Sequence, residues 1–232
     1  MTTEIYKVAA EILAGREKDF MTSVNFDAFA MADKRRSLYN VVRRTIDIIA
    51  VVVTAPAALI VLGFAALAIY VSMGRPIFFT QERVGLNGTI FKMFKLRSMR
   101  PTDHKIKTSK ATIHNDPRVT PLGRYLRRSH IDELPQLWNI LRGDMTLIGP
   151  RPEQVHLVEL YRKAIPYFDC RHMVKPGLSG WAQVRFGYAT DTKDTRAKVH
   201  YDLFYLMNYG PMLDFRILVH TIKAFFDPNL FH

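Results

Sequence analysis

The acidic pair Asp132-Glu133 is the part of the sequence best suited to chemistry. It lies in the segment Ser129–Gln136, SHIDELPQ, and Pro135 follows it closely. Proline is tolerated in the first turn of a helix, where backbone N–H groups have no partner, so we expect a helix to begin near Asp132. The N–H groups and the helix dipole stabilise a charged carboxylate there. Taken alone, the segment is better explained as a helix cap with an acidic first turn.

The surroundings of the pair are rich in arginine, and this favours a chemical role. Arg151 lies between two prolines in Gly149–Glu153, GPRPE, where a stiff backbone suits bidentate binding of phosphate. Carboxylates such as Asp132 and Glu133 can hold Mg²⁺, which shares oxygen ligands with substrate phosphates. A carboxylate can also act as the nucleophile in phosphoryl transfer. The alternative for Arg151 is a surface ion pair. Four arginines precede the acidic pair: Arg118, Arg124, Arg127 and Arg128.

Two weaker signals lie downstream. The segment Val174–Val184 begins as a glycine-rich turn, in which backbone N–H groups can approach a ligand closely. Asp202 is a lone acidic residue in an otherwise aromatic and apolar stretch. Most such residues face solvent, so neither signal assigns a ligand without further context.

Composition limits the classes of partner. The 232 residues carry a formal net charge of +12, which favours an anionic partner such as nucleic acid, a phosphorylated small molecule or anionic lipid. The single cysteine, Cys170, cannot form an internal disulfide, so we expect a reducing, cytosol-facing location. The length suits one domain plus an anchor or extension.

The residues that position the acidic pair begin with a membrane segment. Residues 48–73 contain no charge, and a helix of this length could cross a hydrocarbon core of ~30 Å. An ordinary transmembrane helix is one interpretation. However, basic residues flank the run on both sides, and basic flanks prefer the cytoplasm. Pro56 lies inside the run and should kink the helix. We therefore expect a re-entrant helix that enters the membrane and returns.

The remaining elements follow from hydrophobic periodicity and turn residues. Residues 76–80 and 90–96 read as strands joined by a turn at 85–88, which predicts a hairpin, and 101–121 reads as a polar loop. Helices are expected at 132–141, 152–165, 197–207 and 211–226. The last of these is basic and amphipathic, so it lies in a membrane interface or packs on a protein core. We divide the chain into an N-terminal extension (1–33), a basic flank with the membrane helix (34–74) and a catalytic domain (75–232).

Several short motifs follow one another in residues 38–226. They are RTID at 44–47, QERVG at 81–85, FKLRSM at 94–99, DPRVT at 116–120, DELPQ at 132–136, GPRP at 149–152, KPG at 175–177, WAQV at 181–184 and YD at 201–202. Taken in order, these motifs resemble those of the bacterial sugar transferases, also called monotopic phosphoglycosyl transferases. One departure is that Pro56 follows the Arg-Asp motif sooner than the family's membrane proline does.

The resemblance implies a fold and a location. The fold class is α/β and mostly helical: a monotopic membrane protein with a re-entrant N-terminal helix, interfacial amphipathic helices and a small β-hairpin in the catalytic core. The catalytic domain would face the cytoplasm at the bacterial inner membrane, in contact with anionic membrane lipid. The sequence does not determine the oligomeric state, and a homo-oligomer is compatible with it.

The resemblance also implies a reaction and a set of residues. Asp132 would attack the β-phosphate of a UDP-sugar and release UMP, and the sugar phosphate would then pass from Asp132 to undecaprenyl phosphate. Glu133, with Asp132, would hold Mg²⁺. An aspartate of low pKa would need no general base in the first step. The phosphate-binding and substrate-binding candidates are Lys95, Arg118, Arg151 and Asp202.

Two other functions remain open from the residues themselves. A non-catalytic membrane adaptor would bind anionic lipid or nucleic acid through the net charge of +12. It would not explain an acidic pair among arginines, and the sequence has no recognisable nucleic-acid motif, so we expect no nucleic-acid partner. A nucleotidyl transferase would use similar residues but would release pyrophosphate. The sequence does not name the transferred sugar; we expect glucose or galactose.

Overall fold

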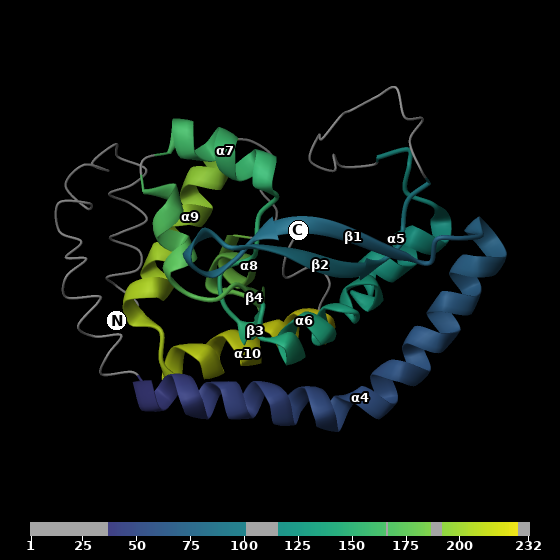
Figure 1. The fold of residues 1–232 in the computed structure, drawn as a ribbon, viewed down its shortest axis with the longest axis horizontal. Coiled ribbons are helices and arrows are strands. Elements are labelled where there is room, and N and C mark those ends of the chain that lie inside the picture. The colour runs from purple at the N-terminus through teal and green to yellow at the C-terminus, as the bar shows by residue number, and fades with distance from the viewer. Residues whose placement is uncertain (1–36, 101–115, 166, 187–191, 227–232) are drawn as a thin grey trace.

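The computed structural model describes residues 37–100, 116–165, 167–186 and 192–226 (Figure 1). This part of the chain is mostly helical and contains two separate two-stranded sheets, in agreement with the expected class. The expected N-terminal extension and most of the expected polar loop lie outside the described residues. The element order is α4 (Ser37–Met73), β1 (Phe78–Val84), η1 (Leu86–Gly88), β2 (Ile90–Leu96), α5 (Pro121–Arg128), η2 (Ile131–Glu133), α6 (Gln136–Arg142), β3 (Thr146–Ile148), α7 (Val155–Ala164), η3 (Phe168–Met173), β4 (Gly177–Ser179), α8 (Trp181–Phe186), α9 (Thr192–Asn208) and α10 (Pro211–Phe226).

The predicted hairpin is present, with a longer first strand than expected. β1 pairs antiparallel with β2 from Phe78 opposite Leu96 to Val84 opposite Ile90. Asn87 makes the turn possible, because it adopts a positive φ of 52° that asparagine tolerates better than most residues. Successive side chains of a strand point to opposite faces. One face of the hairpin therefore carries Gln81 and Arg83 together with Lys95.

The second sheet is a parallel pair that sequence periodicity did not predict. β3 and β4 contain three residues each, which is too short for an alternating pattern. Their close approach requires glycine at 177, where a Cβ would lie 2.0 Å from the backbone nitrogen of Gly149. The pairing places the GPRP segment after β3 beside the KPG segment before β4.

Helix α4 is long, apolar and mostly exposed. Its residues Leu38–Met73 are long and apolar enough to cross a membrane by length and composition. Pro56 lies in its interior, and Figure 1 shows that the helix first runs beneath the folded core and then bends toward the start of the hairpin. The side chain of Arg97 donates hydrogen bonds to the carbonyls of Met73 and Gly74, both 2.6 Å long. The far end of α4 is therefore attached to the core.

The near end of α4 is attached to the same core by charged side chains. Arg43 forms an ion pair with Asp214 of α10 at 3.3 Å, and Arg44 donates to the carbonyl of Leu141 at the end of α6 at 2.7 Å. Asp47 accepts a hydrogen bond of 3.2 Å from the backbone N–H of Leu147. Asp47 follows Arg43 and Arg44 at the spacing at which side chains meet on a helix. No ion pair joins Asp47 to either arginine among the described residues.

The largest core cluster lies between α7, η3, α8, α9 and α10, and its bulkiest fully buried side chains are Trp181, Tyr205 and Phe168. Helix α10 has the predicted bounds, and it packs on the protein core as one of the two interpretations of its sequence expected. It buries Ile217 in this cluster, whereas Phe215 on the other face is 62% exposed. The helix thus packs on the core with one face and presents an apolar face outward.

Candidate active site

The acidic pair lies on a short 3₁₀ turn, and not in the first turn of an α-helix. The turn η2 spans Ile131–Glu133, follows a positive φ of 55° at His130, and is separate from α6, which begins at Gln136. The expected helix start at Asp132 was therefore wrong, because Pro135 stands immediately before the first residue of the later helix α6. The sharp turn after α5 directs the Asp132 side chain inward, where the residue is only 6% exposed.

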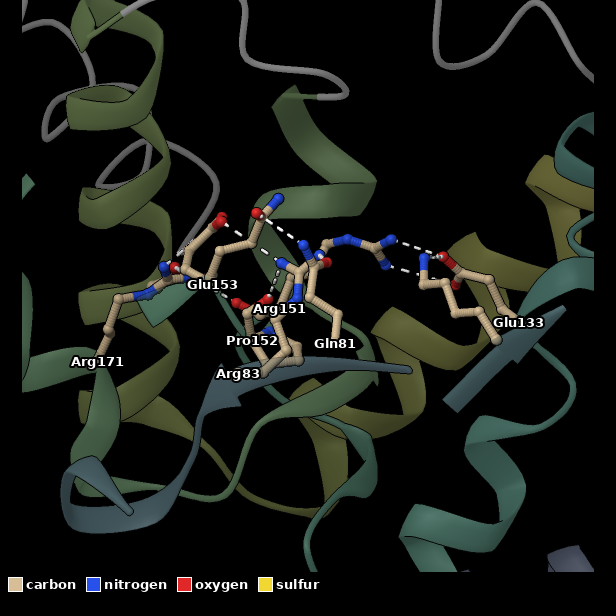
Figure 2. Close-up of polar contacts among 10 residues, drawn as sticks. Gln81, Arg83, Glu133, Arg151, Pro152, Glu153 and Arg171 are labelled. Carbon is tan, nitrogen blue, oxygen red and sulfur yellow. Dashed lines mark hydrogen bonds and ion pairs between the residues drawn. The ribbon is translucent and has the colours of Figure 1, made fainter. Parts of the chain in front are cut away.

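Glu133 is held between two cations from different elements. Its Oε1 atom lies 2.7 Å from Lys95 Nζ on β2 and 2.6 Å from a guanidinium nitrogen of Arg151. A second nitrogen of Arg151 lies 3.4 Å from Oε2. Figure 2 shows the guanidinium of Arg151 extended toward this carboxylate. The structure thus brings together four of the predicted site residues: Asp132, Glu133, Lys95 and Arg151.

The two neighbouring carboxyl groups have opposite pKa shifts. Burial alone would raise the pKa of Glu133, but the positive charges of Arg151 and Lys95 outweigh burial and lower the pKa well below its usual value. For Asp132, burial dominates and raises the pKa, with Glu133 adding to the rise while Lys95 and Arg127 oppose it. The expectation of a low-pKa aspartate was wrong, because burial raises the pKa of Asp132 by more than the nearby cations lower it.

The raised pKa of Asp132 predicts the acid side of the pH profile. A protonated carboxyl is a poor nucleophile, so a donor reaction through Asp132 should lose rate as pH falls through the pKa of Asp132. We expect this loss to begin above the ~3.9 of an ordinary aspartate. The measurement is kcat/KM for the donor sugar against pH in the range where the protein stays folded. A profile that stays flat down to ordinary aspartate pKa values would contradict the assignment.

Two predicted site residues do not contact this cluster. Arg118 is held by Asp116, whose oxygens lie 2.8 and 2.5 Å from its guanidinium nitrogens. Asp202 is fully buried on α9 and forms an ion pair with Arg171 at 2.7 Å. Burial raises the pKa of Asp202 to about 6, although Arg171 opposes the rise. Neither side chain reaches Asp132 or Glu133 in the described structure.

Several polar residues near Arg151 had no role in the sequence interpretation. Arg83 donates to the carbonyl of Pro152 at 2.9 Å and to Gln81 at 2.7 Å, and Gln81 donates to Gln154 at 2.8 Å. Figure 2 shows Arg83 and Arg171 on either side of Glu153. Strand alternation could have placed Gln81 and Arg83 on the face of Lys95. The pairing of that face with the GPRP segment depends on tertiary structure.

The acidic pair also suits a divalent cation. No group of three or more His, Cys, Asp or Glu side chains gathers among the described residues, so Asp132 and Glu133 would supply the protein's carboxylates. Magnesium usually takes one or two carboxylates and fills its remaining positions with water and substrate phosphate. Two adjacent carboxylates beside the cations Lys95 and Arg151 fit that requirement.

The fold and the site together define a membrane-associated protein with a buried, cation-lined carboxylate. A sequence model described as bacterial sugar transferase matches residues 38–228. The chain belongs to the bacterial sugar transferase family, as the resemblance of its motifs predicted.

Named relatives agree with this membership. The chain is 41% identical over 187 residues to the UDP-N-acetylgalactosamine-undecaprenyl-phosphate N-acetylgalactosaminephosphotransferase of Aeromonas hydrophila, covering 81% of this chain and 44% of the relative. It is 43% identical over 159 residues to the UDP-glucose:undecaprenyl-phosphate glucose-1-phosphate transferase of Xanthomonas campestris pv. campestris, covering 67% and 33%. It is 37% identical over 193 residues to the exopolysaccharide production protein PSS of Rhizobium leguminosarum bv. phaseoli, covering 79% and 94%. The chain therefore spans less than half of the first two relatives.

Proposed function

We propose that this protein transfers a sugar-1-phosphate from a UDP-sugar to undecaprenyl phosphate and releases UMP, as the first step of an exopolysaccharide or O-antigen type of glycan. The names of the relatives supply the two substrates. The observation that carries the proposal is the buried Asp132, which adjoins a carboxylate held by Lys95 and Arg151. This arrangement combines a nucleophile with cations that suit a diphosphate.

In the first half-reaction, a carboxylate oxygen of Asp132 forms a bond to the β-phosphorus of the donor. The bond from that phosphorus to the bridging oxygen breaks, and UMP leaves with the oxygen. Lys95 and Arg151 can stabilise negative charge on the phosphate oxygens, which is the main contribution a protein makes to phosphoryl transfer. The raised pKa of Asp132 indicates a carboxylate that is incompletely solvated by water and protein. Such a carboxylate is a stronger nucleophile than one held by hydrogen bonds.

In the second half-reaction, a phosphate oxygen of undecaprenyl phosphate attacks the same phosphorus. The bond between the phosphorus and Asp132 breaks, so the carboxylate is regenerated and the sugar leaves on a polyprenol diphosphate. One nucleophile thus divides a difficult transfer between two anions into two steps. The turn η2 that carries Asp132 also contacts α4, so the acceptor's phosphate can arrive from the membrane side.

Bound Mg²⁺, held by Glu133 and Asp132, would neutralise part of the diphosphate charge and so lower the repulsion between donor and nucleophile. Glu133 is the better placed of the two to stay ionised, because Arg151 and Lys95 lower its pKa. Its ion pairs with these cations also leave it in position before any ligand binds.

We also propose that α4 is re-entrant, with both ends at the cytoplasmic face of the inner membrane. The support is that the same core holds both ends: Arg43 reaches Asp214 at one end, and Arg97 reaches Met73 and Gly74 at the other. A helix that crossed the membrane could not satisfy both sets of contacts. The exposed apolar face of α10 lies beside the first part of α4 and suits the membrane interface.

Single-cysteine labelling tests this topology. Leu38→Cys and Arg75→Cys are each made with Cys170→Ser. Neither cysteine should react with a membrane-impermeant thiol reagent in intact cells, and both should react once the reagent has access to the cytoplasmic side. Reaction of the two positions from opposite sides of the membrane would overturn the re-entrant arrangement and leave a single crossing.

The experiment that tests the reaction is UMP release from a panel of UDP-sugars, with detergent-solubilised protein, Mg²⁺ and undecaprenyl phosphate. Release of UMP with one donor, over many turnovers only when the acceptor is present, would establish the reaction and name the sugar. In the same assay with UTP and a sugar-1-phosphate in place of the UDP-sugar, release of pyrophosphate would instead indicate a nucleotidyl transferase. A folded protein that releases neither from any donor would remove the proposed chemistry while leaving the family membership intact.

A further inference from the structure

Four consecutive carbonyl groups around Arg151 are all held by hydrogen bonds from other elements. The carbonyl of Pro150 accepts from the N–H of Gly177 at 2.9 Å, and that of Glu153 accepts from the N–H of Val84 at 3.0 Å. Between these two, the acceptors are satisfied by arginine side chains. Because all four carbonyl groups are held, the backbone of this segment has little freedom to rotate. The fixed backbone sets the direction in which the Arg151 side chain leaves the segment.

The two arginine donors come from opposite sides of the segment. Arg83 of β1 donates to the carbonyl of Pro152 at 2.9 Å, and Arg171 of η3 donates to the carbonyl of Arg151 itself at 2.9 Å. Arg171 thus contacts the backbone of Arg151, and the guanidinium of Arg151 contacts Glu133. Figure 2 shows this sequence from Arg171 through Arg151 to Glu133.

Arg171 is in turn fixed by its own partners. Its side chain is 6% exposed and forms an ion pair at 2.7 Å with Asp202, which is 2% exposed. The guanidinium also lies 5.2 Å from the ring centre of Phe168. Burying two charges is costly unless the pair has good geometry and further hydrogen bonds. The hydrogen bond from Arg171 to the carbonyl of Arg151 is such a bond.

We propose that Asp202 and Arg171 form a positioning pair, which acts on the donor diphosphate by holding the backbone of Arg151 so that its guanidinium faces the site. The proposal rests on the proposed transferase function for the identity of that diphosphate. It also assigns Asp202 a role that needs no contact with substrate. The pair acts through one hydrogen bond, from Arg171 to the carbonyl of Arg151. It should therefore have no effect on donor binding in a protein that lacks the Arg151 side chain.

A double-mutant cycle tests the dependence on Arg151. Arg171→Lys keeps a positive charge near Asp202, but the lysine side chain is shorter and lacks the terminal nitrogen that contacts both Asp202 and the Arg151 carbonyl. We expect it to lower kcat/KM for UMP release by roughly tenfold or more, mainly through KM for the donor, because small displacements of a positioned group are costly. In an Arg151→Ala protein, adding Arg171→Lys should change kcat/KM by less than about twofold. Equal losses in both backgrounds would overturn the proposal.

The matched control is Arg162→Lys, which alters an arginine on the surface that contacts Asp169 at 2.5 and 2.9 Å. It should leave kcat/KM unchanged. Asp202→Asn provides a second variant should Arg171→Lys fail to fold. It should lower kcat/KM in the wild-type background but not in the Arg151→Ala background.

The same cycle on the dissociation constant of UDP separates this proposal from the transferase reaction. If the wild-type protein binds UDP but releases no UMP, the reaction fails, and coupling of Arg171 to Arg151 in UDP binding would still support the positioning pair. If UDP binding does not change in Arg151→Ala, or if the two substitutions act independently, the positioning pair is wrong whether or not UMP is released.

Discussion

Asp132→Asn protein should release UMP at least about a thousandfold more slowly than the wild type while it stays folded and membrane-bound. Asparagine has the size of aspartate, so the tight packing around a side chain of 6% exposure is preserved. The amide is a very weak nucleophile, and the loss of a covalent catalyst removes the low-energy route and not just one interaction. Initial rates with a coupled assay for UMP measure the loss directly, and Asp132→Ala should behave in the same way.

A covalent intermediate gives the same assignment an independent readout. Incubation with the donor and without acceptor should add the mass of one sugar phosphate to the peptide that contains Asp132, and only in the wild type. Asp144→Asn is the matched control, because this carboxylate is paired with Arg142 at 3.4 Å and does not belong to the acidic pair Asp132-Glu133. The turnover of Asp144→Asn should be close to normal. Normal turnover in Asp132→Asn would move the nucleophile to another residue.

The local parts of the fold could be predicted because neighbouring residues determine them. The hairpin follows from a short first strand, a turn at Asn87 and an alternating second strand, and α10 follows from a helical pattern that begins at Pro211. The start of the hairpin was misplaced by two residues, and α5 was missed, although Thr120 caps it through the N–H of Gly123. Its eight residues include four charged or glycine residues, which obscure the apolar periodicity.

The site was predicted in its residue types but not in its pairing. Asp132, Glu133, Lys95 and Arg151 come from η2, β2 and the segment after β3, so their meeting depends on how these elements pack. Arg118 was assigned to phosphate from its charge and motif, but two residues away Asp116 occupies it. A sequence shows which side chains carry charge, whereas the partner that neutralises each charge is decided by folding.

Asp202 illustrates a second limit. A lone carboxylate in an apolar helix reads as a solvated residue or as a ligand for substrate. In the structure it is buried against Arg171, a residue in a 3₁₀ turn more than thirty positions earlier. Burial with a partner that is distant in sequence has no periodic signal. The resemblance to the family identified the position, and only the contacts indicate how the residue acts.

Glu133→Gln should lower UMP release by about a hundred- to a thousandfold, the range seen when one group that stabilises transition-state charge is removed. The pKa of Glu133 is far below its usual value, so the residue is ionised at every pH at which the enzyme works. The substitution therefore removes a full negative charge and leaves Lys95 and Arg151 without their shared partner. Initial rates across a series of Mg²⁺ concentrations measure the effect.

The Mg²⁺ dependence distinguishes two ways in which Glu133 can act. If Glu133 binds the cation, Glu133→Gln should raise the Mg²⁺ concentration needed for half-maximal rate by at least about tenfold, because a charged oxygen ligand is lost. If Glu133 only orients Lys95 and Arg151, this concentration should stay unchanged and KM for the donor should change instead. The second result would contradict the proposed metal role. Glu133 would then be a residue that holds two phosphate-binding cations apart, with Asp132 as the remaining carboxylate ligand for Mg²⁺.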